Sequence, residues 1–367
     1  MKIAVTGAGL TGLAAGCRLA RKGHDVTVFE EAPQAGGLAS AFKAGSENLD
    51  KFYHHVFTSD LHLLNLLGEL SLSDKLKWYE PKNAIYIDST LYPFTTPFDL
   101  LAFRPLSFIS RIRTGLLVLS SGILKNYRPL ELITAREWIV RRSGRDAYEK
   151  VWGPLLKSKF DIDAGNVSGT WIWNKFKLRG SSRGKNISKE LLADVCEDLP
   201  GGYRESLRAV KFKANLCLAL ELRESLSPYY WITISQEGLP FVLIIEHTNL
   251  TGLRGYGSHI VYLSRYLDAS DPLFYASDDE ITELFTKGLK AVFPGFDPAC
   301  VNRSTLSRTR YAQPVVTVGY EKRIPEIKTP LDGLYLASMP QIYPEDRGLN
   351  YALELGERAA GVILDNL

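Results

Sequence analysis

The chain has 367 residues, of which 45% are apolar and 23% charged, and its formal net charge is +3 at pH 7. This composition is ordinary for a globular protein and argues against disorder, and the length suffices for two domains. So small a net charge gives no support to nucleic-acid binding. Four cysteines lie far apart, which predicts neither a disulfide framework nor a metal site: Cys17, Cys196, Cys217 and Cys300. Because Met1 leads directly into an apolar strand, no signal peptide is expected, and the predicted location is cytoplasmic.

The first predicted unit is strand, turn, helix and strand. An apolar strand over 2–6 runs into Gly7-Ala8-Gly9-Leu10-Thr11-Gly12, a helix follows, and a second strand over 25–29 ends on Glu30. Glycines at this spacing permit the tight turn, let the backbone approach a pyrophosphate, and let the helix pack closely on the strand. The helix N-terminus offers free N–H groups to the phosphates. Glu30 can accept both ribose hydroxyls and would repel a 2′-phosphate, so the unit predicts a dinucleotide other than NADP.

The next segment indicates which dinucleotide is bound. Glu31-Ala32-Pro33-Gln34-Ala35-Gly36-Gly37-Leu38-Ala39-Ser40 carries paired glycines. It resembles the segment after the ribose-binding acid in flavoproteins of the amine oxidase, protoporphyrinogen oxidase, phytoene desaturase and UDP-galactopyranose mutase group. In these families the glycines let the chain pass against the flavin diphosphate and ribityl. The resemblance therefore implies FAD rather than NAD, with Glu31, Gly36, Gly37 and Leu38 at the cofactor, although most members have Arg where Leu38 stands.

Residues 52–60 are similar to a stretch of the mutases in which a histidine lies near the flavin face. The resemblance makes His54 and His55 candidates for a catalytic proton donor or a flavin contact, since imidazole titrates near working pH. The alternative is that one of them packs against the sheet and hydrogen-bonds to the backbone.

From about residue 61 to 180 the apolar spacing is that of helices, over 61–72, 100–124 and 134–160. Thr134 and Glu137 form a capping box at the start of the last of these. The apolar stretch 114–124 is too short to cross a bilayer. Basic residues precede it, so it could lie on a membrane surface. A helix that covers a substrate cavity is the alternative that we favour.

Residues 177–213 depart from the families named above. There those families carry a long segment with the strand that meets the adenine and a β-meander. Here Pro200-Gly201-Gly202-Tyr203 leads almost directly to the next strand. We therefore predict that the chain is an internally shortened member whose cofactor sheet lacks strands. Such a protein would bind FAD weakly or not at all, and it would expose a sheet edge prone to association.

Alternating apolar residues predict an antiparallel substrate sheet, with strands over 214–222, 229–234, 242–247 and 260–263. A helix over 278–292 begins with acids, as the helix dipole favours. His247 ends an inner strand and is a candidate for the substrate cavity. Arg265 and Arg308 are candidate substrate residues that would clamp a diphosphate in a mutase, and Tyr343 is a further candidate.

The C-terminal segment is predicted as a strand over 331–337, a loop, and a helix over 349–360. It resembles the terminal flavin-binding motif of the amine oxidase superfamily, in which the helix N-terminus points at the isoalloxazine. Such an N-terminus stabilises the negative charge of reduced flavin. The resemblance implies these cofactor contacts: Gln341, Asp346, Gly348, Leu349 and Asn350.

The predicted fold class is α/β, with a discontinuous Rossmann-like FAD-binding domain and an inserted α+β substrate domain on an antiparallel sheet. The FAD-binding domain would comprise 1–60 and 305–367, with 177–213 as a shortened remnant, and the substrate domain 61–176 and 214–304. The resemblance implies an FAD-dependent oxidoreductase that transfers hydride between a small organic substrate and flavin. A nucleotide-sugar mutase and a shortened, catalytically silent paralogue are the alternatives.

Overall fold

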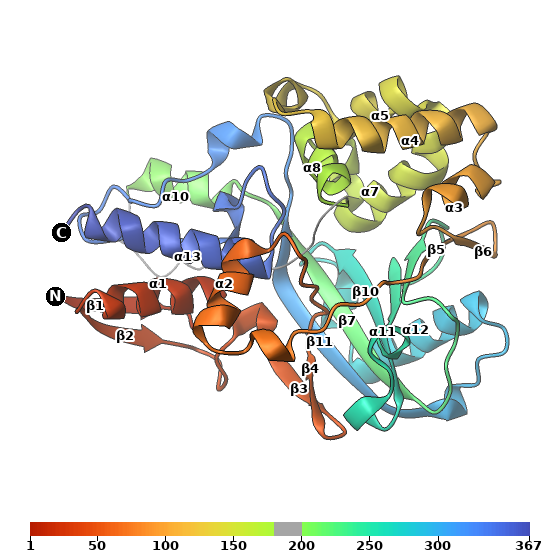
Figure 1. Cartoon of the computed structure of the whole chain (residues 1–367), viewed down its shortest axis with the longest axis horizontal. Coiled ribbons are helices and arrows are strands. Elements are labelled where there is room, and N and C mark those ends of the chain that lie inside the picture. Colours follow the sequence, from red (N-terminus) through yellow and green to blue (C-terminus); the bar gives the residue numbers. More distant parts are fainter. Residues whose placement is uncertain (180–199) are drawn as a thin grey trace.

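The computed structural model describes residues 1–179 and 200–367. One half of the molecule is built from both ends of the chain (Figure 1). In it, β1 (Lys2–Thr6) and β2 (Asp25–Phe29) pair in parallel, and α1 (Leu10–Arg21) connects them. The C-terminal helix α13 (Leu349–Leu364) packs on α1. Both helices begin toward the centre of the molecule and end on the side where the two termini lie.

The close approach of α13 to α1 depends on Gly356. A Cβ at this position would lie 2.4 Å from the Thr11 carbonyl oxygen, well inside van der Waals contact.

The predicted helix over 349–360 is confirmed and continues to Leu364. The predicted strand over 331–337 is wrong, because this stretch turns back on its own preceding residues and makes one isolated bridge, Lys328 to Tyr335.

The cofactor sheet has two strands within the described residues. Its residues are largely exposed, and Phe29 is 57% exposed. A large part of the predicted shortened remnant, residues 180–199, lies outside the described residues. The shortening of the chain and the association of its sheet edge stay predictions.

The other half contains a seven-stranded sheet in the order β11-β7-β10-β9-β8-β5-β6. Neighbouring strands are antiparallel except for β5 and β8, which are parallel. The strands are β5 (Asn83–Ile87), β6 (Thr90–Pro93), β7 (Phe212–Leu222), β8 (Trp231–Ile234), β9 (Leu243–Glu246), β10 (His259–Leu267) and β11 (Val301–Pro314). The four predicted strands are confirmed as β7 to β10, with shifted ends.

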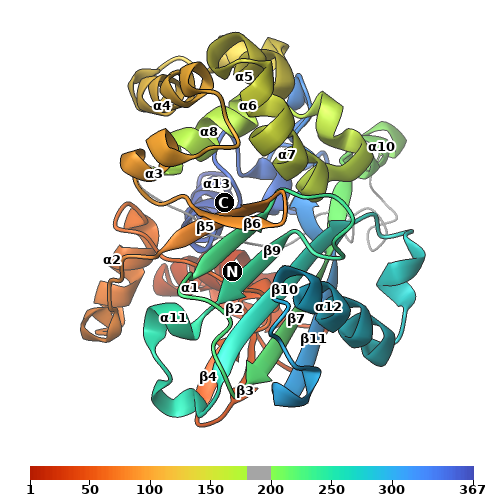
Figure 2. The same ribbon diagram turned by 90° about the vertical axis from the view of Figure 1, so that its right-hand side faces the viewer.

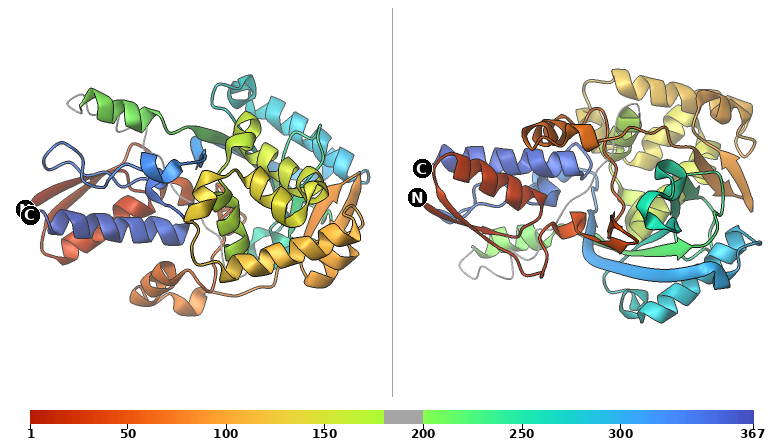
Figure 3. Two further views of the ribbon diagram at one scale, coloured as in Figure 1. Left: turned by 90° about the horizontal axis from the view of Figure 1, so that it is seen from above. Right: turned by 60° about the horizontal axis from the view of Figure 1, so that its bottom comes forward.

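Three strands of this sheet were not expected from the sequence. β5 and β6 interrupt a region with mostly helical spacing. β11 runs along one edge of the sheet (Figure 3), and its sequence is polar because an edge strand is partly exposed. Residues 305–314 therefore belong to the large sheet, although the expected domain limit placed them with the cofactor half. The division into domains stays a prediction.

Each face of the large sheet has its own cover. Leu216, Leu218 and Leu220 of β7 pack with α12 (Asp278–Val292). Cys217 and Ala219 face the other way and pack with the hairpin of β3 (Ala41–Ala44) and β4 (Glu47–Asp50). This alternation follows from the period of two in a strand. α12 has the predicted bounds and begins with a capping box of Ser277 and Glu280.

A helical layer lies over one end of the sheet (Figure 2). It contains α3 (Pro97–Ala102), α4 (Phe108–Ile123), α5 (Ala135–Ser143), α6 (Arg145–Ala147), a π-helical turn (Tyr148–Trp152), α7 (Gly153–Phe160) and α8 (Gly169–Arg179). The predicted capping box of Thr134 and Glu137 is confirmed at the start of α5. Outside this layer, the described residues also form α2 (Leu61–Glu69), α10 (Gly201–Arg208) and α11 (Thr248–Thr251). In the described part of the chain, no helix combines the length and hydropathy needed to span a bilayer.

Candidate cofactor site

The glycine-rich turn between β1 and α1 is as tight as its sequence predicts. Gly7 has φ +98°, and its amide donates to the Phe29 carbonyl at 2.7 Å. A Cβ at Gly12 would lie 2.0 Å from the Gly7 carbonyl oxygen. Gly9 precedes α1, which has no side-chain cap and no acid in its first turn. The N–H groups of this first turn, which includes Leu10 and Thr11, can therefore take a phosphate.

Glu30 lies directly beside this turn. Its Oε2 accepts from the Ala8 amide at 2.7 Å and its Oε1 accepts from the Ala32 amide at 2.9 Å. These two bonds fix the carboxylate at the end of β2, and each oxygen keeps a lone pair for a further donor. The carboxylate thus fits the ribose hydroxyls of a dinucleotide.

The second glycine pair meets the first. The Gly36 amide donates to the Ala8 carbonyl at 2.8 Å, and Gly36 forms a bridge with Gly9. Gly36 has φ +118°, which favours glycine, and Gly37 begins a short 3₁₀ turn. Leu38 packs against buried apolar clusters, and Glu31 is exposed. The structure therefore brings the two glycine motifs and Glu30 together.

α13 begins seven residues before Gly356, the residue that packs on the start of α1. Gly348 precedes the helix and offers no side-chain cap. Asn350 is buried, and its Oδ1 accepts from the Leu63 amide near the start of α2 at 3.2 Å. Gln341 bonds to the loop around it, since it accepts from Ser338 and donates to Pro325 and Leu336. Both helices thus have uncapped N-termini, whereas the side chains of Gln341 and Asn350 support the protein's own backbone.

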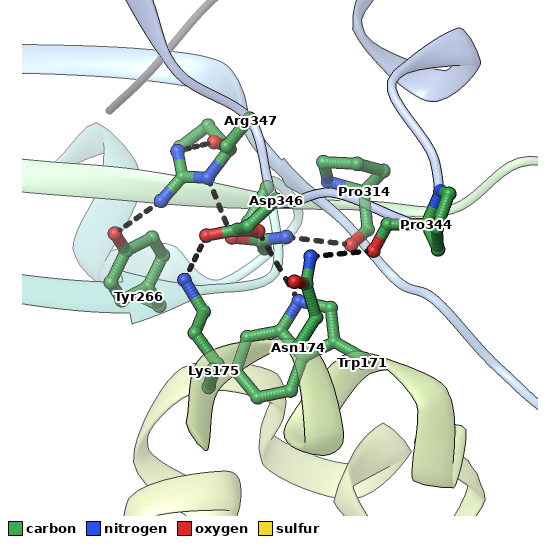
Figure 4. A network of polar contacts seen from close by, with 10 residues as sticks. Trp171, Asn174, Lys175, Tyr266, Pro314, Pro344, Asp346 and Arg347 are labelled. Carbon is green, nitrogen blue, oxygen red and sulfur yellow. Dashed lines mark hydrogen bonds and ion pairs between the residues drawn. The ribbon is translucent and has the colours of Figure 1, made fainter. Parts of the chain in front are cut away.

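A buried polar network surrounds the residues just before α13 (Figure 4). Asp346 forms an ion pair with Lys175 and accepts from Trp171 Nε1 at 3.2 Å. Arg347, which is 3% exposed, donates to Gln313, to the Ala312 carbonyl and to the Tyr266 hydroxyl. These contacts join α8, β10 and β11 to the loop that leads into α13. Of this network the sequence indicated Asp346 alone.

The charges in this network are unequal. Burial by itself would raise the pKa of Asp346, but the cations Lys175, Lys159 and Arg347 hold that pKa well below its usual range. The Lys159 ammonium lies 5.1 Å from the centroid of the Trp171 ring and 5.4 Å from that of Tyr266. Burial, assisted by the neighbouring charge of Lys175, lowers the pKa of Lys159 well below its usual range. The Asp346 carboxylate is thus ionised, and basic side chains surround it.

The two candidate histidines each have a side-chain partner. His54 Nδ1 lies 3.1 Å from Asp50 Oδ2, and its ring is 3% exposed. His54 Nε2 is buried and has no hydrogen-bond partner within the residues described. His55 Nδ1 lies 2.9 Å from the Tyr230 hydroxyl, within an aromatic cluster. His54 Nε2 is therefore available for a further hydrogen bond, and the catalytic role of either residue stays a prediction.

His247 lies on the same face of the large sheet as β3 and β4. Its Nε2 is 3.1 Å from the Tyr256 hydroxyl, and burial lowers its pKa to about 4. The folded protein therefore favours the neutral ring. This contribution to stability is full above the unfolded pKa of about 6.5 and is lost as the pH falls toward 4.

We expect His247→Gln to lose less stability on acidification than the wild type. Between pH 7 and pH 4.5 the difference should be roughly 1–3 kcal/mol, because glutamine has no proton to take up. Urea unfolding of both proteins at the two pH values measures it. Equal losses in both proteins would show that His247 is not held neutral.

The other substrate candidates lie elsewhere. Arg265 and Arg308 both stand opposite Leu216, on the sheet face that α12 covers. Arg265 donates to the Pro240 carbonyl, and Arg308 donates to two carbonyls and pairs with Asp278 at the start of α12. The structure therefore does not bring these two arginines to the cofactor side. The Tyr343 hydroxyl is buried within a tyrosine cluster and has no partner in the described part of the chain.

A groove of about 630 Å³ lies apart from all of these residues, between α10 and residues 322–330. None of the predicted site residues lines it. The chemistry-bearing residues therefore define the candidate site, and this groove does not. Among residues 1–179 and 200–367, no cluster of three or more metal-ligating side chains occurs.

The parallel strand pair, the glycine turn and the two helix N-termini define a dinucleotide-binding protein of the flavoprotein type. Residues 10–211, more than half of the chain, match the family described as flavin containing amine oxidoreductase. The chain belongs to this family, and the cofactor that the family implies is FAD.

Curated relatives of the chain include desaturases. A zeta-carotene desaturase of Synechocystis sp. is 26% identical over 237 residues, which are 58% of this chain and 48% of that protein. A 4,4′-diapophytoene desaturase of Staphylococcus haemolyticus is 58% identical over 50 residues, 14% of this chain and 10% of that protein. The chain thus spans about half the length, or less, of the curated relatives that it matches.

Solved structures share the fold over the whole chain. A protein classed as a protoporphyrinogen oxidase from Exiguobacterium sp. 255-15 has a TM-score of 0.76 at 14% identity and covers 99% of both chains. Reduced UDP-galactopyranose mutase has a TM-score of 0.74 at 12% identity, over 99% of this chain and 94% of that one. These likenesses confirm the predicted fold class.

Proposed function

We propose that the chain binds FAD at the junction of its two halves and transfers hydride between a small organic substrate and the flavin. The observation that carries this proposal is the packing of α1 against α13, two helices with uncapped N-termini, in which Thr11 at the start of α1 lies beside Gly356, seven residues after the start of α13. FAD supplies the hydride-accepting ring when it is bound. The protein binds and orients the cofactor and the substrate, and it places complementary charge beside them.

Individual residues take distinct parts in this proposal. The turn from Gly7 to Gly12 and the first turn of α1 hold the pyrophosphate, and Glu30 holds the ribose. The first turn of α13 faces the flavin ring, where its positive end favours negative charge. His54 Nε2 is the buried nitrogen that can hold a proton toward the substrate. A cytoplasmic location belongs to the same proposal.

The mutase alternative finds less support. It needs cations at the cofactor side to hold a nucleotide-sugar diphosphate, and Arg265 and Arg308 lie on the opposite face of the sheet. Both are already engaged with carbonyl oxygens of the protein. The oxidoreductase is therefore the function that we put forward.

The test is a calorimetric titration of the apo-protein with FAD, followed by anaerobic reduction of the bound flavin with candidate substrates. We expect binding about two orders of magnitude weaker than nanomolar, because the cofactor sheet of residues 1–179 and 200–367 has two strands and offers none to the adenine, and each lost hydrogen bond removes about 0.5–1.5 kcal/mol. A nanomolar dissociation constant would show that the adenine is well covered. A protein that takes up no FAD at all would be the catalytically silent paralogue.

A further inference from the structure

Helix α4 has its polarity reversed relative to an ordinary surface helix. Its buried side carries mainly small hydroxyl residues, Ser110, Thr114 and Ser121, together with Leu117. Its outer side carries six large apolar residues that are between 40% and 79% exposed: Phe108, Ile109, Ile112, Leu116, Leu119 and Ile123. A surface helix normally buries its apolar stripe and exposes its polar one. We call these six residues the α4 face.

Helix α4 lies at the margin of the helical layer (Figure 2), and the six side chains of the α4 face are exposed. The inner side of α4 packs on α5 and α8. These contacts prevent the helix from rotating to bury its apolar residues. Exposed apolar residues of α3, Phe98 and Leu101, extend the surface. Contiguous exposed apolar surface of this size marks an interaction site. The expectation that this helix covers a substrate cavity stays a prediction.

The charge around the α4 face identifies its partner. Residues 97–145 contain nine basic and three acidic residues, a net charge of +6, whereas the whole chain has +3. Exposed cations flank both ends of α4: Arg104 before it and Lys125 and Arg128 after it. Arg113 binds the carbonyls of Arg141 and Arg142, which places the exposed end of α5 beside α4. An apolar stripe with a basic rim matches an anionic lipid surface.

A second copy of the chain fits this surface poorly. A symmetric contact through the α4 face would place the same patch on both sides, as two-fold interfaces do. It would bring together two segments that each carry +6. Like charges across an interface are unfavourable, whereas anionic headgroups neutralise the basic rim.

We propose that the α4 face docks onto the surface of an anionic lipid bilayer, with α4 lying in the plane of the interface. The apolar side chains enter the boundary between headgroups and acyl chains, and the flanking cations contact the headgroups. This inference concerns a different surface from the cofactor site and stands independently of the proposed function.

The test is flotation of the full chain with vesicles of phosphatidylcholine alone and with 30 mol% phosphatidylglycerol. We expect binding to the anionic vesicles, which Leu119→Glu should weaken at least tenfold. The matched control is Leu284→Glu, the same substitution at an exposed position of α12, which should bind within twofold of the wild type. Lys125→Glu should weaken binding to the anionic vesicles more than fivefold, since each basic residue contributes about fivefold.

Circular dichroism and the thermal midpoint check that each variant is folded, which the exposure of the replaced residues predicts. Light scattering separates the rival occupant of the surface. A dimer that Leu119→Glu converts to a monomer would overturn the proposal in favour of a second copy. Failure of the wild type to float with anionic vesicles, or equal binding by wild type and Leu119→Glu, would also overturn it.

Discussion

Replacing Gly12 by alanine should lower FAD affinity at least a hundredfold and destabilise the protein. The new Cβ would lie 2.0 Å from the Gly7 carbonyl oxygen, so the turn and the start of α1 must move apart. Overpacking of this kind costs about 1–3 kcal/mol, and the displaced N–H groups no longer converge on the pyrophosphate. Calorimetric titration with FAD and urea unfolding measure the two effects.

The matched control for this variant lies one turn further along the same helix. At Gly16 a Cβ would lie 3.5 Å from Val26 Cγ1 and from Val28 Cγ2, which is ordinary contact. Gly16→Ala should therefore keep FAD binding and gain up to about 1 kcal/mol from helix propensity. If both variants behave alike, the close approach at Gly12 is not what shapes the site.

The second large effect is expected at Asp346. Asp346→Asn leaves Lys175, Lys159 and Arg347 around a neutral amide, in a network that is largely buried. Removing one partner of a buried ion pair costs about 3–5 kcal/mol, because the remaining charge is uncompensated. Urea unfolding at pH 7 measures this loss. The control is Glu237→Gln, which removes an exposed ion pair with Lys157 and should cost less than about 1 kcal/mol.

The same variant has a defined pH dependence. The pKa of Asp346 is depressed in the folded protein, so its contribution to stability is full above the unfolded value of about 3.9 and is lost only as the pH falls well below it. The stability difference between wild type and Asp346→Asn should therefore be constant from pH 5 to pH 8. A difference that grows steadily over this range would mean that Asp346 titrates there and is not held ionised by its cations.

Periodicity located most of the regular structure. The antiparallel strands at 214–222 and 260–263 and the helix at 278–292 have strong alternation or helical spacing together with end signals, and all three formed. The strand predicted at 331–337 did not form as a strand. An extended segment becomes a strand only when another strand is available to pair with it, and this depends on residues distant in the sequence. β11 was missed for the converse reason, since pairing with β7 forms it despite its polar sequence.

The candidate site divides along similar lines. The turn around Gly7 and Gly12, with Glu30 after it, is built from contacts within 30 residues and was readable as a local motif. In the network around Asp346, Lys175 lies 171 positions from Asp346, and Tyr266 lies 81 positions from Arg347. Only folding brings these residues together. The faces of Arg265 and Arg308 likewise depend on strand register, which places both on the α12 side.

The sequence by itself therefore determined the dinucleotide turn and most of the helices and strands, because short-range sterics and periodicity encode them. The family resemblance rested on the motifs themselves. The tertiary structure alone decided which polar side chains remain available. It engaged Asn350 with α2 and left His54 Nε2 without a partner among the described residues. It also decided that α4 turns its apolar residues outward, since periodicity shows that a helix has two faces and packing against α5 and α8 selects the one that is buried.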